Sequence, residues 1–211
     1  MKKLKIPFIK DIASFEEFAA AFQKLSSHKV NEISWFDYPY LPTVSFKIAY
    51  STQSILLEYK VQEKHLKAVY LETNQPVYKD SCVEFFISFD KIHYYNFEFN
   101  SLGTALVGYG TENRSTRKHL PVDLIEKIKT KSIVTASKEE SIDNSWILQL
   151  EIPFELLYNE NIESLNGIEA TANFYKCGDD LPQPHFVSWN EIESPEPNFH
   201  LPEFFGKVTF I

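Results

Sequence analysis

Glycine and methionine are scarce in this sequence of 211 residues, and their scarcity excludes several kinds of chemistry. The six glycines form no phosphate-binding loop, no dinucleotide fingerprint and no Gly-x-Ser-x-Gly elbow, so nucleotide binding and serine nucleophile chemistry have no support. The only methionine is Met1, which leaves a bis-histidine arrangement as the remaining way to ligate a haem. The six histidines show no metal-site spacing, so the sequence contains no zinc signature.

Cysteine is also rare, because Cys82 and Cys177 are the only two in the chain. They lie far apart in the sequence, in segments that read as strands. A disulfide would require those two strands to be neighbours. Because no secretory signal is found, we expect reduced, buried thiols.

Excess positive charge and long apolar runs are missing as well. The net charge of -8 argues against a nucleic-acid partner, since phosphate binding requires a basic patch. No apolar segment approaches the length of a membrane span. The basic start of the chain is followed by Lys10 and Asp11 where a signal peptide needs an apolar core, so we expect a cytoplasmic protein by default, or an exported one if the sequence has lost a leader. The oligomeric state is not indicated.

Aromatic residues and short alternating segments are abundant and predict an all-β fold. Aromatic side chains make up 15% of the chain, enough for a large core. The predicted strands span residues 44–49, 55–62, 67–72, 81–89, 94–100, 133–137, 146–152, 169–176 and 207–211. A capping box from Ser14 to Glu17 predicts one helix, residues 123–129 give a weaker second one, and residues 103–117 read as a surface excursion. Many short strands with little helix indicate a β-sandwich, here one domain over residues 1–211.

The segment 78–100 carries the most informative pattern. Val83, Phe85 and their alternates share one face of the first arm, and Tyr95, Phe97 and Phe99 share one face of the second. The opposite faces carry Glu84, Phe86, Asn96, Glu98 and Asn100. Carboxylates, amides and rings are the groups that bind a polar, non-ionic ligand such as a sugar.

Three readings of this polar face stay open. Glu84 and Glu98 could be the acid–base pair of a glycoside hydrolase, which needs two carboxylates across the scissile bond. They could instead accept hydrogen bonds from sugar hydroxyls without catalysis, or they could lie on a solvated face. A structural calcium on Asp80, Asp90 or Asp179-Asp180 is a further option, although turn formation explains strand-end aspartates more simply.

Three aromatic residues could form the walls of a sugar pocket, because sugar rings stack their C–H faces on aromatic rings. Tyr78 precedes the acidic strand, Tyr175 closes a later strand, and Trp189 follows in Val187-Ser188-Trp189-Asn190. The simpler alternative for Trp189 is a place in the hydrophobic core.

An ordered series of motifs resembles family 9 carbohydrate-binding modules, and in particular the stand-alone Bacteroides-type members. The series consists of Asp80-Ser81-Cys82-Val83-Glu84-Phe85-Phe86-Ile87, Tyr95-Asn96-Phe97-Glu98-Phe99-Asn100, Trp146 with Ile152-Pro153, Asn173-Phe174-Tyr175-Lys176-Cys177-Gly178-Asp179, His185-Phe186-Val187-Ser188-Trp189, and Phe199-His200-Leu201-Pro202-Glu203-Phe204-Phe205-Gly206. These matches run from about residue 42 to residue 210.

The resemblance implies an antiparallel β-sandwich of jelly-roll or immunoglobulin-like type, with one or two short helices and a non-catalytic sugar site. Two aromatics clamp a terminal sugar in this family, and the matching positions are Tyr78 and Trp189. Glu84 matches a carboxylate that accepts sugar hydroxyls, and Asn100 and Lys176 fall at positions of polar contacts. Tyr78 stands where better-known members have Trp, and Glu98 stands where a basic residue is expected.

We therefore expect a carbohydrate ligand and no cofactor, apart from the optional structural calcium. The predicted sugar-binding residues are Tyr78, Glu84, Asn96, Glu98, Asn100, Tyr175, Lys176 and Trp189. The rival hypotheses are a glycosidase using Glu84 and Glu98, a haem-binding sandwich of related shape, and a structural or interaction sandwich with no sugar site.

Overall fold

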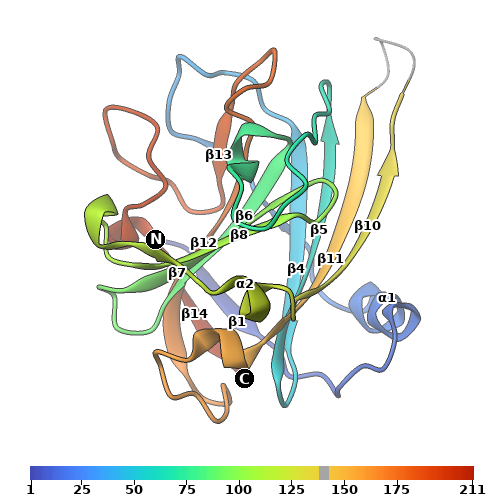
Figure 1. Cartoon of the computed structure of the whole chain (residues 1–211), viewed down its shortest axis with the longest axis vertical. Helices are drawn as coiled ribbons and strands as arrows, with labels where there is room; N and C mark the ends of the chain where they lie inside the picture. Colours follow the sequence, from blue (N-terminus) through green and yellow to red (C-terminus); the bar gives the residue numbers. More distant parts are fainter. Residues whose placement is uncertain (138–142) are drawn as a thin grey trace.

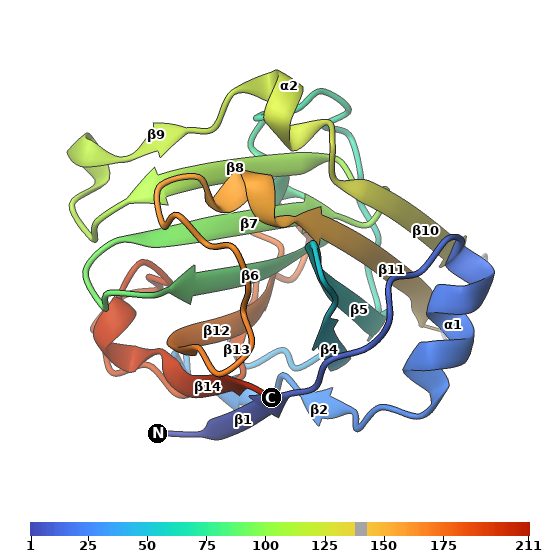
Figure 2. The same ribbon diagram turned by 90° about the horizontal axis from the view of Figure 1, so that it is seen from below.

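Two β-sheets pack face to face in the computed structural model, which describes residues 1–137 and 143–211 (Figures 1 and 2). The larger sheet has the order β1-β14-β12-β6-β7-β8-β9, and β13 and β3 join it through β12. Its strands are β1 (Lys3–Ile6), β3 (Glu32–Ile33), β6 (Cys82–Ser88), β7 (Tyr94–Asn100), β8 (Ala105–Gly110), β9 (Lys118–His119), β12 (Glu169–Cys177), β13 (Phe186–Ser188) and β14 (Gly206–Phe210).

The smaller sheet has the order β10-β11-β5-β4-β2. Its strands are β2 (His28–Lys29), β4 (Thr43–Tyr50), β5 (Ser54–Glu63), β10 (Lys129–Thr135) and β11 (Asn144–Pro153). The pairings in both sheets are antiparallel except for β1 with β14, which is parallel. The predicted β-sandwich is confirmed.

The main core lies between the sheets and is built from every second residue of the long strands. Because side chains alternate across a strand, Phe85 of β6 and Phe174 of β12 point inward while their sequence neighbours point outward. Phe46 of β4 stacks on Phe174 with ring centroids 3.7 Å apart. Burial of these large rings removes much apolar surface from water and is the main force that holds the sheets together.

Helix α1 (Phe15–Gln23) covers the outer face of the smaller sheet, as Figure 2 shows. The side chain of Ser14 accepts a hydrogen bond from the Glu17 amide, so the predicted capping box starts this helix. Phe18 and Phe22 pack against Ala49 and Leu56 of that face. The second helix, α2, is shorter than expected (Val122–Ile125). Four 3₁₀ turns complete the helical content of the described residues: η1 (Val77–Lys79), η2 (Arg114–Thr116), η3 (Phe154–Leu157) and η4 (Pro202–Phe204).

One predicted strand is wrong, because residues 67–72 form no strand. The amides of Val69 and Tyr70 donate instead to Oδ2 of the buried Asp80, at 2.9 and 3.0 Å. A side chain therefore takes the hydrogen bonds that a neighbouring strand would have taken.

The predicted surface excursion over residues 103–117 is also wrong in part, because it contains the buried strand β8. A Cβ on Gly108 would lie 2.6 Å from Oδ1 of Asn96, and one on Gly110 would lie 2.8 Å from the backbone of Arg117. The glycines that suggested a loop are there because other groups approach the strand closely.

None of the described helices is both long enough and apolar enough to cross a membrane.

Candidate functional site

The outer faces of β6, β7 and β12 bring polar side chains together at the centre of the larger sheet. Glu84 lies directly opposite Glu98 on one side and Tyr175 on the other. The predicted alternation of the two arms is confirmed, since Val83, Phe85, Phe97 and Phe99 point into the main core. The polar face is not solvated, because Glu84 and Glu98 are 3% and 4% exposed.

A cavity of about 300 Å³ opens over this face. Its lining comes from β6, β7, η1, the ends of β12 and β13, and the loop before η4. The lining residues are Tyr78, Glu84, Glu98, Cys177, Asp179, Phe186, Pro197, Asn198, Phe199 and His200.

Glu98 lines this cavity, and its two carboxyl oxygens differ in their hydrogen bonding. Its Oε1 accepts a hydrogen bond from Nδ2 of Asn96 at 2.8 Å, whereas the buried Oε2 has no hydrogen-bond partner among the described residues. Burial raises the pKa of Glu98 to about 7, although Asn96 and the Arg117 guanidinium oppose the shift. Arg117 is held in place because it lies 4.0 Å over the ring of Tyr94 and donates to Oδ1 of Asn96.

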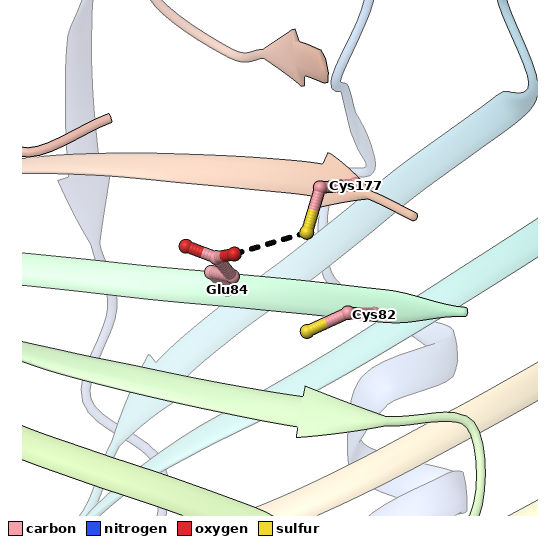
Figure 3. A group of neighbouring side chains, drawn as sticks. All are labelled: Cys82, Glu84 and Cys177. Carbon is pink, nitrogen blue, oxygen red and sulfur yellow. Dashed lines mark hydrogen bonds between the residues drawn. The ribbon is translucent and has the colours of Figure 1, made fainter. Parts of the chain in front are cut away.

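Glu84 lines the cavity. Figure 3 shows its side chain beside those of Cys82 and Cys177. The thiol of Cys177 donates to Oε1 of Glu84 at 3.0 Å. Burial raises the pKa of Glu84 well above its usual value, and the neighbouring Cys177 and Glu98 act in the same direction. Among the described residues, Cys82, Glu84 and Cys177 form the group whose ligand atoms lie close enough together to hold a metal ion.

Aromatic rings form the sides of the cavity. Phe199 stacks on Tyr175 with ring centroids 4.1 Å apart, and the edge of Phe186 meets Phe199 at 6.2 Å. The ring of Trp35 contacts the rings of both Phe186 and Phe199. Tyr78, on η1, is half-buried and lines the cavity together with Phe199.

The sequence of residues 15–210 matches the family model for carbohydrate-binding family 9. This chain belongs to that family. The match covers nearly the whole β-sandwich, and the predicted resemblance is confirmed. Family 9 modules bind carbohydrates without catalysis, so the glycosidase hypothesis for Glu84 and Glu98 is set aside.

Known structures agree with this assignment. A presumed carbohydrate-binding protein from Bacteroides uniformis is 35% identical, with a TM-score of 0.90 over 100% of this chain and 99% of that one. Two structures of a family 9 module from Caldicellulosiruptor kristjanssonii share the fold at 12% identity. The glucose complex has a TM-score of 0.67 over 100% of this chain and 96% of that one, and the cellotriose complex has 0.64 over 99% and 93%. No curated protein matches the sequence significantly.

Five of the eight predicted site residues of this family 9 chain gather at the cavity. Tyr78, Glu84 and Glu98 line it. Asn96 holds Glu98 from the same strand, and Tyr175 supports the floor beneath Phe199.

A sixth predicted residue, Asn100, lies on the same face but does not line the cavity. Its Nδ2 donates to the Tyr70 carbonyl at 2.8 Å and to Asp80 at 3.1 Å. Asn100 therefore fastens the loop of residues 67–72 to β7.

Trp189 does not stand opposite Tyr78. Strand alternation places Phe186 and Ser188 on the cavity side, because Ser188 pairs with Tyr175. Trp189 follows Ser188 and faces the main core, where its ring packs edge-on against Phe174 at 5.5 Å.

Lys176 also points away from the cavity. It faces the interior between the sheets, where its ammonium forms a buried ion pair with Glu63 of β5 at 2.8 Å. The same ammonium donates to Nε2 of His185 at 2.9 Å, and burial together with this charge lowers the pKa of His185 to about 3.

Several cavity residues were not predicted from the sequence. Phe186 could have been found, because the alternation that turns Tyr175 outward does the same for Phe186 across β13. Asp179, Asn198, Phe199 and His200 lie in loops or at strand ends, where no periodicity indicates the direction of a side chain. Burial raises the pKa of Asp179 to about 6, and the adjacent Asp180 adds to the shift.

The aspartates considered for calcium have local hydrogen-bonding roles. Asp80 accepts from the amides of residues 69 and 70. Asp90 accepts from the amides of Ile92 and His93 and so closes the turn between β6 and β7.

Proposed function

We propose that the cavity binds one sugar ring between Tyr78 and Phe199. The observation that carries this proposal is that one cavity is lined by both aromatic side chains and carboxyl groups. Aromatic rings accept the apolar C–H face of a pyranose, and carboxyl groups bind its hydroxyls.

In the proposed site Phe199 takes the role that the sequence suggested for Trp189, because Phe199 and Tyr78 both line the cavity. The Phe199 ring is fixed from behind by Tyr175 and from the side by Phe186 and Trp35. A fixed ring loses little conformational entropy when a ligand stacks on it, which favours binding.

Glu84, Glu98 and Asp179 are the proposed partners of the sugar hydroxyls. The free Oε2 of Glu98 is a buried acceptor without a partner among the described residues, so a sugar hydroxyl would supply its missing hydrogen bond. Because burial brings the pKa of Glu98 to about 7, its carboxyl group can accept from a hydroxyl when ionised and donate to one when protonated. An uncharged sugar hydroxyl can donate to the ionised carboxylate and accept from the protonated carboxyl group, so it can pair with Glu98 in both protonation states.

The structures with glucose and with cellotriose are of another family 9 module, but they support a glucose-like ring as the first ligand to test. The experiment is an isothermal titration of the full chain with monosaccharides and short β-glucans. Phe199→Ala should weaken binding by about tenfold or more, which corresponds to about 1.4 kcal/mol. Glu98→Gln keeps the shape but changes the charge, and it should also weaken binding.

Trp189→Phe is the matched aromatic control, because its ring lies in the main core. It should lower the free energy of unfolding by about 1 kcal/mol or more and leave the sugar affinity of the folded protein unchanged. Loss of affinity in Trp189→Phe, with Phe199→Ala unaffected, would refute the proposed site. Circular dichroism of each variant verifies that it is folded.

A further inference from the structure

The only two cysteines of the chain meet at the floor of the cavity, although 95 residues separate them in sequence (177 − 82). Cys82 and Cys177 lie directly opposite each other on the antiparallel strands β6 and β12. Glu84 lies two residues beyond Cys82 on the same face. Figure 3 shows the three side chains grouped around one point above the sheet.

The donor atoms of this trio are already close to the arrangement that a tetrahedral metal ion requires. The two Sγ atoms and a carboxylate oxygen of Glu84 all lie within 4.8 Å of one another, and Cys177 Sγ lies 3.0 Å from Glu84 Oε1. Ligands of a tetrahedral zinc ion at ordinary bond lengths are about 3.5–3.8 Å apart. Small side-chain rotations would therefore be enough to enclose the ion.

Acidic side chains face the trio, and the charge of Lys176 opposes them from the other side of the sheet. All three residues are at least nine-tenths buried. The acidic Glu98 of β7 and Asp179 after β12 face them, while Lys176 of the same strand is paired with Glu63 on the opposite side of the sheet. A buried cluster of acidic donors around one point is a favourable environment for a divalent cation.

Access and a free coordination position come from the cavity. Glu84 and Cys177 line it, so an ion can enter from that side and a fourth position stays open to water. Glu98 lines the same cavity, and its buried Oε2 atom, which has no partner among the described residues, could accept a hydrogen bond from that water.

We propose that Cys82, Cys177 and Glu84 form a binding site for a thiophilic divalent cation, with Zn²⁺ as the natural candidate. Two thiolates and one carboxylate select a borderline or soft ion, whereas Ca²⁺ and Mg²⁺ require oxygen ligands. Binding replaces the protons of the two thiols, and of the Glu84 carboxyl group when it holds one, and these protons pass to solvent. Glu84 and Glu98 are also the proposed partners of sugar hydroxyls, so metal binding is tested without sugar, and its outcome does not decide whether the cavity binds a sugar.

The test uses the full chain, reduced and stripped of metal with a chelator, and then titrated with Co²⁺ and with Zn²⁺ in the absence of sugar. The expected result is about one equivalent of metal per chain. Bound Co²⁺ should show a thiolate-to-cobalt charge-transfer band in the near ultraviolet and the visible bands of tetrahedral cobalt. Cys177→Ser, Cys82→Ser and Glu84→Gln should each weaken Zn²⁺ binding by about 100-fold or more, a loss at or beyond the upper end of what second-shell changes cause.

Glu155→Gln, at an exposed carboxylate, is the control and should bind Zn²⁺ like the unmodified chain. The cobalt spectrum is recorded on the unmodified chain, so the proposal can be refuted even if the cysteine variants fail to fold. Failure of the reduced chain to take up metal would overturn it. A cobalt spectrum without thiolate charge transfer would also overturn it, as would cysteine variants that bind Zn²⁺ as tightly as the unmodified chain does.

Discussion

At the scale of single residues, burial and strand alternation decide which polar side chains can contact a ligand. Glu84 and Glu98 point to the cavity, whereas Lys176, next to Tyr175 on β12, points to the opposite side. The residue types alone made all three equally good candidates for a polar contact. Only the position of each residue on its strand, together with the loop that covers one face, distinguishes them.

Lys176 is expected to act on stability rather than on sugar affinity. Lys176→Met leaves Glu63 buried without its ion-pair partner, so the free energy of unfolding should fall by about 3–5 kcal/mol. Urea denaturation measures this change, and the double variant Lys176→Met with Glu63→Gln should regain part of the loss. Lys127→Met, which breaks an exposed pair with Glu155, is the control and should cost at most about 1 kcal/mol. An equal cost for the two single variants would contradict the structural role of Lys176.

At the scale of elements, the predicted strands in the centre of the sheets were correct because both their faces follow a clear alternation. β6, β7 and β12 each bury one apolar face in the main core. The segment 67–72 has a similar alternation but no neighbouring strand, because Asp80 and Asn100 hold its backbone. Such long-range hydrogen bonds leave no local trace in the sequence.

For β8 the prediction failed in the opposite direction. Its glycines led us to predict a surface loop where the structure has a strand. Gly108 is required because it pairs with Asn96 of β7, whose Oδ1 lies close over Gly108 while its Nδ2 donates to Glu98. The cavity residues from the loop before η4 were unpredictable for a related reason, because a loop has no period that fixes side-chain direction. The sequence thus predicted the floor of the candidate site better than its walls.

Gly108→Ala is expected to damage the site through a neighbouring strand. The added methyl group would lie 2.6 Å from Oδ1 of Asn96, so Asn96 must move and Glu98 would lose its hydrogen bond. We expect sugar affinity to fall several-fold and the free energy of unfolding to fall by about 1–3 kcal/mol. Calorimetric titration and urea denaturation measure the two effects.

Gly167→Ala is the control for this variant. Gly167 has a φ of +79° and no atom near the added methyl group, so alanine there is strained but does not touch Asn96. It should lower stability and leave sugar affinity unchanged. Equal sugar affinities of the Gly108→Ala and Gly167→Ala variants would show that Asn96 is not the residue that positions Glu98.

At the scale of the whole molecule, two sets of buried groups respond to acid in opposite directions. The raised pKa values of Glu98 and Asp179 favour the folded state as the pH falls, because their protonated forms are the ones that burial tolerates. His185 acts in the other direction. Its pKa is lowered from 6.5 to about 3 in the folded state, so the unfolded chain takes up a proton first.

His185 should therefore make the folded state less stable as the pH falls from about 6.5 towards 3. Nε2 of His185 accepts from the Lys176 ammonium, so its protonation would place two positive charges in contact. The expected loss is about 1.4 kcal/mol per pH unit in this window. Urea denaturation between pH 7 and pH 4 measures it against His185→Gln, which cannot take up the proton. Identical pH slopes for the two proteins would show that His185 is not held neutral in the fold.

The proposed sugar site is tested most directly by a crystal structure of the chain with the tightest-binding sugar from the titration series. The expected result is a sugar ring between Tyr78 and Phe199, with a hydroxyl within hydrogen-bond distance of Glu98 and no contact with Trp189. A sugar bound on another surface, with only solvent in this cavity, would contradict the proposed site.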